Sequence, residues 1–297
     1  MSGSILVTGA GGFIGRHLVA ALQSKGHTVA THSIEDGDIA RDELSFSGIE
    51  HVFHLAGQSF VPESWRDPRR FCETNVLGAI NVLEFCRRQA ASLTYVSSYV
   101  YGQPLHLPIS EEHPRSAPNP YALSKIMGED ACMFYARQMG LRICIVRPFN
   151  IYGPGQDSRF LIPTIAEQAL AAPDGAIVVA DLRPKRDFLY VSDFVSLLVA
   201  TFEHQSAGIY NAGSGVSVSI GELVAMVTSI TGERKLVSRE ERREHEILEV
   251  RAGIRKAQRE LNWQPCVSLQ AGIREVIAAI SAAGPVGSGR AGKESGI

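Results

Sequence analysis

The sequence TGAGGFIG, from Thr8 to Gly15, follows the apolar run SILV and precedes a segment with helical periodicity. Glycines spaced in this way between a strand and a helix predict a dinucleotide-binding site. Gly9 permits the tight turn, Gly12 lets the backbone approach a pyrophosphate, and Gly15 allows close packing of the helix. The phosphates would lie at the helix N-terminus, where N–H groups are unpaired. The cofactor-binding residues predicted in this segment are Gly9, Gly12, Phe13, Ile14 and Gly15.

Short apolar runs continue beyond this segment and alternate with helical patterns. The runs are SILVTG, HTVAT, HVFHLAG, LTYVSS and LRICIVRP. Such alternation indicates an α/β fold, a doubly wound parallel Rossmann-type sheet with helices on both faces. We predict this dinucleotide-binding domain over residues 1–156, with later elements near 187–212 returning to it. Residues 157–281 would mainly form a smaller C-terminal substrate-binding lobe, partly interleaved with late sheet elements such as AIVVAD and GIYNAG. The Gly/Ser-rich segment 282–297 is predicted to be disordered.

The composition is that of an ordinary globular protein. The chain has 297 residues, of which 45% are hydrophobic and 20% charged, with a formal net charge of −2. A balance without basic excess argues against nucleic acid or a membrane surface as partner. We find no signal-peptide pattern and no apolar run of the roughly 20 residues that a membrane span needs. The five cysteines include no CxxC pair, which argues against a disulfide framework and a zinc site. We expect a cytoplasmic protein without a metal.

The choice between NAD and NADP depends on the end of the second predicted strand. An acidic residue that binds the adenosine ribose of NAD is expected there, about 20 residues beyond the glycines. That strand ends near His32 without an Asp or Glu, and Glu35 and Asp36 follow slightly later. Arg16 is placed to approach a 2′-phosphate, although a solvated helix arginine is an equally good interpretation. The sequence favours NADP(H) slightly, and NAD(H) stays open.

A second motif, PNPYALSK at residues 118–125, places Tyr121 four residues before Lys125. The two prolines suit the entry to a helix, and the sequence continues as a long helical pattern. In a helix Tyr121 and Lys125 share a face. The ammonium group would then lower the pKa of the phenol from its usual value of about 10, which is too high for proton transfer at neutral pH. The alternative for an isolated YxxxK is a core aromatic beside a solvated lysine.

Together these motifs resemble the extended short-chain dehydrogenase/reductase family, the group of nucleotide-sugar epimerases, dehydratases and reductases. The resemblance rests on TGxxGxxG, on HLAG after the third main strand and on YxxxK, and it covers most of the chain, about residues 4–280. It implies further cofactor contacts, a bracing asparagine and a substrate contact. These are Asp38 and Ile39 near the adenine, Leu55, Ala56 and Gly57 in the cofactor-facing turn, Asn75 as the brace, Pro148 near the nicotinamide and Asn150 near the substrate.

The resemblance also implies the catalytic residues. Tyr121 would pass a proton to or from a sugar hydroxyl, and Lys125 would bind the nicotinamide ribose and lower the pKa of the phenol. A serine hydroxyl in YVSSYVYG would orient the reacting oxygen. Counting back from VYG selects Ser97, whereas a loop shortened by one residue would select Ser98.

The same segment narrows the reaction. Dehydratases of the family read TDEVYG here, and Ser98 and Tyr99 stand in place of their two carboxylates. Decarboxylases keep Glu at the position of Tyr99, and the epimerase/reductases that make GDP-fucose carry Cys there. The chain is most similar to GDP-4-keto-6-deoxymannose reductases and related nucleotide-sugar 4-ketoreductases. We therefore expect NAD(P)H-dependent reduction of a 4-keto-6-deoxy sugar, as in deoxysugar biosynthesis. A 4-epimerase with tightly bound NAD is the first alternative, and a non-catalytic NADP-binding sensor or regulatory protein is the second.

The expected partner is a nucleotide-diphosphate sugar, whose pyrophosphate suits the planar fork of arginine. The resemblance assigns this role to Arg186 and Arg243, although REERREHE alone would read as a solvated charged segment. Ser98, Tyr99 and Asn150 complete the predicted substrate contacts. A homodimer is expected through helices around residues 66–90 and 120–139, unless their apolar faces pack on their own sheet.

Four further residues are given structural interpretations or mark a departure from the family pattern. Asp193 and Asn211 match family motifs, with structural roles equally expected; His54 is read as a packed histidine, and Gly253 replaces the usual Asp.

Overall fold

A six-stranded parallel sheet forms the centre of the larger lobe in the computed structural model, which describes residues 4–171, 176–232, 235–239 and 247–283. Its strand order is β2-β1-β3-β4-β5-β9, and all neighbouring strands are parallel. The strands are β1 (Ser4–Thr8), β2 (Val29–His32), β3 (Ile49–His54), β4 (Ser92–Val96), β5 (Ile143–Pro148) and β9 (Gly208–Ala212). The predicted Rossmann-type sheet is confirmed. Because the order reverses beside β1, the carboxyl ends of β1 and β3 border a crevice.

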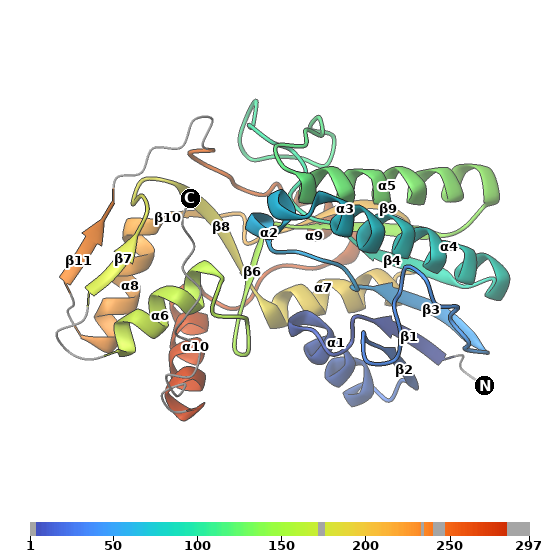
Figure 1. Ribbon diagram of the computed structural model, residues 1–297, viewed down its shortest axis with the longest axis horizontal. Helices are drawn as coiled ribbons and strands as arrows, with labels where there is room; N and C mark the ends of the chain where they lie inside the picture. Colours follow the sequence, from blue (N-terminus) through green and yellow to red (C-terminus); the bar gives the residue numbers. More distant parts are fainter. Residues whose placement is uncertain (1–3, 172–175, 233–234, 240–246, 284–297) are drawn as a thin grey trace.

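Helices cover both faces of this sheet (Figure 1). On one face lie α3 (Pro68–Cys72), α4 (Gly78–Gln89) and α5 (Pro120–Met139), and on the other lie α1 (Phe13–Ser24) and α7 (Val191–Glu203). The short helix α9 (Arg255–Leu261) packs against β9 and α7. Between β3 and α3 the chain forms α2 (Val61–Arg66), and α3 continues through the π-helix η1 (Glu73–Leu77) into α4.

In its described part, the smaller lobe contains two short sheets and three helices, which lie beside the central sheet (Figure 1). One sheet has the order β10-β8-β6, and in the other β7 pairs with β11 in parallel. The elements are β6 (Asn150–Tyr152), β7 (Ala176–Val179), β8 (Lys185–Tyr190), β10 (Ser217–Ser219), β11 (Lys235–Ser238), α6 (Leu161–Leu170), α8 (Ile220–Thr231) and α10 (Leu269–Ala283). Two late segments, AIVVAD and GIYNAG, were both predicted as sheet elements interleaved with the smaller lobe. GIYNAG forms β9 and joins the central sheet. AIVVAD, as β7, pairs with β11 instead.

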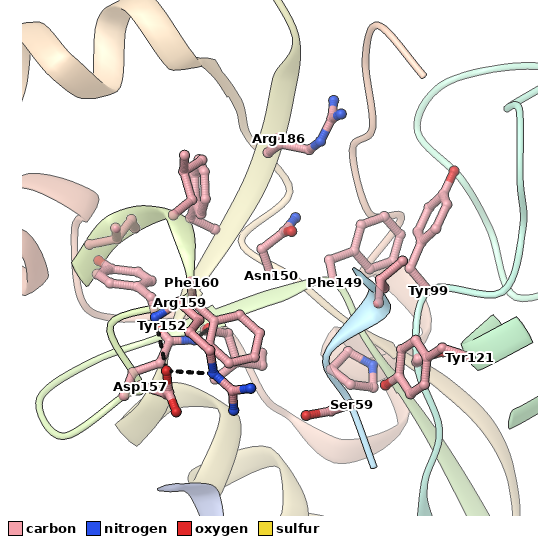
Figure 2. A pocket seen from close by; sticks show the side chains of 18 of the residues that line it. Ser59, Tyr99, Tyr121, Phe149, Asn150, Tyr152, Asp157, Arg159, Phe160 and Arg186 are labelled. Carbon is pink, nitrogen blue, oxygen red and sulfur yellow. Dashed lines mark hydrogen bonds and ion pairs between the residues drawn. The ribbon is translucent and has the colours of Figure 1, made fainter. Parts of the chain in front are cut away.

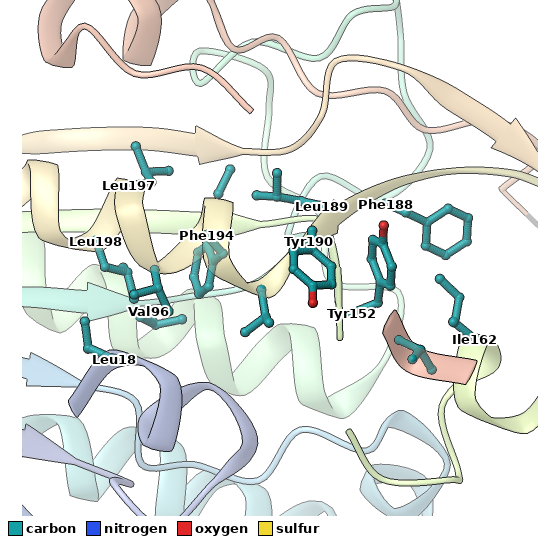
Figure 3. Close-up of a cluster of buried hydrophobic side chains, with 14 of the residues drawn as sticks. Leu18, Val96, Tyr152, Ile162, Phe188, Leu189, Tyr190, Phe194, Leu197 and Leu198 are labelled. Carbon is teal, nitrogen blue, oxygen red and sulfur yellow. The ribbon is translucent and has the colours of Figure 1, made fainter. Parts of the chain in front are cut away.

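One hydrophobic cluster joins the two lobes (Figure 3). Leu18 of α1 and Phe194 of α7 belong to the larger lobe, whereas Ile162 of α6 belongs to the smaller lobe, and Tyr152 and Tyr190 lie between them. The division at residues 156 and 157 stays a prediction, because this shared core contains side chains from both sides of it. At the C-terminus, α10 continues to Ala283, so residues 282 and 283 are helical rather than disordered. The rest of the predicted tail lies outside the described residues.

No described helix combines the length and the apolar character needed to pass through a lipid bilayer.

Candidate active site

A cavity of about 990 Å³ lies where the carboxyl end of the central sheet meets the smaller lobe. It brings together the glycine-rich turn after β1, the ends of β3, β4 and β5, the start of α5, and residues of α6, β7 and β8. The predicted site residues that line it are Gly9, Gly12, Phe13, Ile14, Gly15, Leu55, Gly57, Ser97, Ser98, Tyr99, Tyr121, Lys125, Pro148, Asn150 and Arg186. Asp38, Ile39 and Ala56 do not line it, and Arg243 lies outside the described residues.

The glycine-rich turn leaves a cradle that only glycine can form. Gly9 has φ +72°, and a Cβ there would lie 2.6 Å from the amide nitrogen of Ala56. A Cβ on Gly15 would lie 2.2 Å from the carbonyl oxygen of Gly9. Helix α1 begins at Phe13, with no side-chain cap and no acidic residue in its first turn. Its first N–H groups can therefore receive an anion, which fits the pyrophosphate of a dinucleotide.

The residues predicted at the adenosine end of the cofactor differ in their exposure to solvent and in their contacts. The Asp38 carboxylate accepts a hydrogen bond from Ala40 N (3.0 Å) and is 40% exposed. The side chain of Ile39 is instead buried in the core beside Gly78, and its cofactor contact stays a prediction. Arg16 donates to the carbonyl oxygens of Gly11 and Gly155, both at 3.3 Å.

Helix α5 presents Tyr121 and Lys125 to the cavity. Asn119 caps the helix by accepting a hydrogen bond from Ala122 N (2.8 Å), and Pro120 occupies its first turn. The Lys125 ammonium donates to the carbonyl oxygen of Val96 at 2.7 Å, and burial lowers its pKa to about 8. Burial raises the pKa of the Tyr121 phenol to about 12. Desolvation raises this pKa and Ser98 lowers it, so the lowering of the phenol pKa by Lys125 stays a prediction.

Two neighbouring serines follow the end of β4, and their hydroxyls lie in different surroundings. The Ser97 hydroxyl donates to the Glu129 carboxylate at 2.6 Å. The Ser98 hydroxyl is buried and lowers the pKa of Tyr121, so it lies beside the phenol, although it does not reach full hydrogen-bond geometry. This arrangement favours Ser98 over Ser97 as the hydroxyl next to Tyr121. The physical reason is that the Ser97 hydroxyl is bonded to Glu129, which Arg147 holds in turn.

Asn75 connects the cofactor-facing turn to α5. Its Oδ1 accepts from Gln58 N at 2.8 Å, and its Nδ2 donates to Gln58 O at 3.0 Å and to Ser124 Oγ at 2.9 Å. Asn75 lies in η1, where Gly78 N donates to the carbonyl oxygen of Glu73. Short π-helices of this kind often occur at functional sites. The contacts agree with the bracing position that was predicted for Asn75.

Tyr99 and Phe149 form an aromatic wall next to Tyr121 (Figure 2). Their ring centroids are 5.2 Å apart in an edge-to-face arrangement. The Tyr99 hydroxyl donates to Gly102 O at 2.6 Å and points away from the Tyr121 hydroxyl. Burial also raises the pKa of Tyr99 well above its usual value. Tyr99 is therefore arranged as a wall, and its phenol is poorly suited to exchange protons with a ligand.

The polar residues predicted to bind substrate extend from this wall toward the smaller lobe (Figure 2). Asn150 Nδ2 donates to Asp187 O at 2.9 Å. Arg186 donates to the carbonyl oxygens of Lys185 (3.0 Å) and Ile247 (2.8 Å), and it lies far across the view from Tyr121. The site can thus hold an anionic group at Arg186 and a reacting group at Tyr121.

Sequence reasoning missed a contact between the two lobes at the cavity wall. Arg159 donates to Glu63 at 2.6 Å and to Asp157 at 3.0 Å, and its guanidinium lies 4.6 Å from the ring centroid of Phe60. Glu63 belongs to α2, and Arg159 precedes α6 in the smaller lobe. No sequence motif marks this contact, because its partners come from separate segments.

Four other residues singled out in the sequence have contacts that account for them structurally. Asp193 accepts from the amides of Cys266 and Val267. Asn211 accepts from the Tyr101 hydroxyl, and His54 shares a 2.7 Å hydrogen bond with Thr8. A Cβ at position 253 would lie 2.9 Å from Ile109 O, which explains why Gly253 suits this chain.

Known proteins resemble this chain over most of its length. A family described as "NAD dependent epimerase/dehydratase family" matches residues 5–213. The chain is 33% identical to GDP-6-deoxy-D-mannose reductase of Pseudomonas aeruginosa, over 93% of this chain and 97% of the relative. It is 31% identical to a putative UDP-glucose 4-epimerase of Methanocaldococcus jannaschii, over 92% and 97% of the two chains. Among solved structures, RMD from P. aeruginosa complexed with NADPH is similar, with a TM-score of 0.87, 32% identity and coverage of 95% and 99%.

Proposed function

Because the chain belongs to the NAD-dependent epimerase/dehydratase family, we propose that it reduces the 4-keto group of a nucleotide-linked 4-keto-6-deoxy sugar with NAD(P)H. The glycine cradle at Gly9, Gly12 and Gly15 would hold the pyrophosphate of the cofactor at the start of α1. Lys125 and Pro148 would border its nicotinamide. When bound, the reduced cofactor supplies the hydride that reduces the carbonyl carbon.

The meeting of Tyr121, Lys125 and Ser98 with the glycine-rich turn in one cavity is the observation that carries this proposal. Burial raises the pKa of the Tyr121 phenol to about 12, so the phenol carries its proton at neutral pH, and Lys125 would have to lower that pKa during the reaction for the proton to be transferred. Reduction needs a proton at the oxygen that was the carbonyl, and Tyr121 would provide it. Ser98, beside the phenol, would orient that oxygen.

The aromatic wall supports reduction over elimination or decarboxylation. Tyr99 occupies the place beside Tyr121 where a second acid or base would have to stand, and its hydroxyl is bound to Gly102 O. Two carboxylates in the described lining of the cavity, Asp157 and Asp181, are paired with Arg159 and Arg183. Arg186 would bind the pyrophosphate of the sugar nucleotide, and Asn150 would contact the sugar.

Two other functions remain as alternatives. The likeness to the M. jannaschii relative favours a 4-epimerase, which would oxidise and re-reduce the sugar with tightly bound NAD. A protein that binds NADP without consuming it is the alternative from another class. The presence of Tyr121, Lys125 and both serines in one cavity weighs against that role.

A cofactor-consumption assay tests the proposal. Purified protein would receive NADPH or NADH with a panel of nucleotide-linked 4-keto-6-deoxy sugars, and its bound cofactor would be identified after denaturation. We expect stoichiometric loss of the reduced cofactor with one sugar. No consumption, with NAD released on denaturation and an ordinary nucleotide hexose epimerised, would replace the reductase by the epimerase.

A homodimer is the proposed assembly, through the exposed face of α5 and its neighbour η1. Leu123, Met127 and Phe134 are exposed along one side of α5, and Leu77 is exposed in η1. The opposite side of α5 carries the buried residues Lys125 and Gly128. The exposed apolar side is thus left over after α5 has packed on its own sheet.

A further inference from the structure

Glu129 continues the face of α5 that carries the proposed catalytic residues. Tyr121, Lys125 and Glu129 are spaced by four residues, so they lie on one side of the helix. The Glu129 side chain is fully buried. Its Oε1 accepts from Ser97 Oγ at 2.6 Å and from Arg147 Nε at 2.9 Å, and its Oε2 accepts from Arg147 Nη2 at 2.6 Å. The proposed reaction does not use this carboxylate.

Arg147 is the partner that connects Glu129 to the central sheet. It lies in β5, and its side chain is 3% exposed. Besides its two bonds to Glu129, it donates to the Tyr101 hydroxyl at 3.1 Å and to Glu111 O at 3.2 Å. Arg115 contacts Glu129 from the partly exposed side at 3.3 Å. The carboxylate is therefore held by groups from the residue after β4, from β5 and from the loop before α5.

Packing alone is a weak explanation for this arrangement. Two buried charges lose their hydration, and an apolar pair of similar volume often stabilises a fold as well or better. A two-point contact between guanidinium and carboxylate does, however, fix orientation, because both groups are planar and must align. Here the alignment fixes the rotation and height of α5 against the ends of β4 and β5.

We propose that Glu129 is a positioning residue for the reaction. Through Ser97 and Arg147 it holds α5 so that Tyr121 meets Ser98 and Lys125 meets the carbonyl oxygen of Val96. The bond to Ser97 also turns that hydroxyl away from the phenol, which leaves Ser98 as its neighbour. This role rests on the proposed function, because it assigns Tyr121 and Lys125 their tasks.

The Glu129 charge also acts on Lys125. The titratable groups around Lys125 are Tyr121, Glu129 and Cys132 on α5, His54 on β3, and Tyr95 on β4, whose ring centroid is 4.8 Å from the ammonium. Glu129 raises the pKa of Lys125, whereas burial lowers it. Loss of the Glu129 charge would therefore lower the pKa of Lys125 further, and its ammonium form would be lost at a lower pH.

The test compares Glu129→Gln, Ser97→Ala and the double variant Glu129→Gln/Arg147→Met with the unmodified protein. Glu129→Gln keeps the shape of the side chain but removes its charge, and the double variant also removes the unpaired arginine. We expect Glu129→Gln to lower kcat at least 10-fold, with KM changed less than 3-fold, and to shift the basic limb of the pH profile to lower pH. The double variant should recover thermal stability without recovering kcat. Ser97→Ala should lower kcat less than Glu129→Gln, because the charge pair stays intact.

A second measurement separates this inference from the proposed reaction. NADPH binding would be followed by fluorescence from pH 6 to pH 10, since Lys125 lines the cavity and its titration should appear in the Kd. We expect the inflection to move to lower pH in Glu129→Gln and to stay in place in Ser97→Ala. The positioning role would be overturned if the double variant is stable and its Kd for NADPH has the same inflection pH as in the unmodified protein. The same holds for a normal kcat of that variant with a sugar that the unmodified protein reduces. Failure of the unmodified protein to reduce any keto sugar would instead count against the proposed function alone.

Discussion

Tyr121 is the proposed proton donor, and burial determines the pKa of its phenol. Its phenol gains no stabilising charge from Lys125, whose ammonium is bonded to Val96 O. Burial keeps the phenol protonated, and Ser98 is the side chain that works in the opposite direction. The proposed reaction needs the proton that this state retains, and it also needs the phenol pKa to be lowered for that proton to be transferred.

Replacing Tyr121 by Phe should remove the proton donor and little else. General acid catalysis contributes about 10²- to 10⁴-fold, so kcat should fall by that order. The cradle around Gly9 and Gly15 does not touch the phenol, so the Kd for NADPH should change less than 3-fold. Steady-state kinetics and a fluorescence titration would measure both. Normal turnover by Tyr121→Phe would remove the proposed mechanism.

His51 gives the larger lobe a weakness toward acid. Its ring is buried, bonded to the hydroxyls of Ser92 and Thr94, and burial lowers its pKa to about 3. The pKa of His54 is also lowered to about 3 by burial. In the unfolded chain both would bind a proton below about pH 6.5, so the unfolded state gains protons first.

The free energy of unfolding should therefore fall as the pH drops below about 6.5, by up to about 1.4 kcal/mol per pH unit for each histidine. Urea unfolding at pH 7, 6 and 5 would measure this slope. His51→Gln should be less stable at pH 7 but should show a shallower slope. An equally steep slope in that variant would mean that His51 is not the source.

Some residue positions could be predicted from sequence, and others could not. The glycines, Tyr121 and Lys125 lie at fixed spacing within single segments, so a local pattern predicts their place at the cavity. The choice between Ser97 and Ser98 depends on Glu129 and Arg147, which come from other segments. The pKa of Tyr121 depends on desolvation by the whole fold, which cannot be predicted from the spacing of residues in the sequence.

The two sides of helix α5 have different surroundings. One side carries Lys125, Gly128 and Cys132 against the sheet, and the other exposes Leu123 and Phe134. The long helix was predictable from its uninterrupted pattern. Its closeness to the sheet was not, because that depends on the absence of a side chain at Gly128.

Gly128→Ala should destabilise the protein despite the better helix propensity of alanine. The new Cβ would lie 2.2 Å from the Tyr95 hydroxyl oxygen and 2.9 Å from its Cζ. Overpacking of this kind costs about 1–3 kcal/mol. Because Tyr95 Oη has no hydrogen-bond partner among the described residues, Tyr95→Phe should restore part of the loss. Chemical unfolding of the two single variants and the double variant would measure the coupling, and strict additivity would contradict the proposed clash.

At the scale of the whole molecule, two of the connections among the described residues join the lobes on different sides of the cavity. The shared hydrophobic cluster joins them behind the cavity, and the contact of Arg159 with Glu63 and Phe60 joins them at its wall. The architecture of the larger lobe could be predicted from its alternating strands and helices. The strand pairing of the smaller lobe could not be predicted, because its short strands have no distinct periodicity and pair across long segments.

Phe134→Glu should disrupt the proposed dimer. A charge on the exposed side of α5 would have to be desolvated on association. Size-exclusion chromatography with light scattering should show a dimer for the unmodified protein and a monomer for this variant. Val216→Glu, at an exposed apolar side chain of the smaller lobe, is the matched control and should stay dimeric. A monomeric unmodified protein would contradict the assembly.

The π-helix η1 has a consequence that concerns the number of residues rather than their kind. Residues 68–89 are helical throughout, and η1 inserts one residue more than a regular α-helix would use. The wider turn takes up this residue locally, so deleting it would let the segment run on as α-helix with the turns on either side nearly in phase. The deletion would remove the widened turn from which Asn75 reaches Gln58 and Ser124. One extra residue of chain length thus shapes the backbone around Asn75 without turning the rest of the helix.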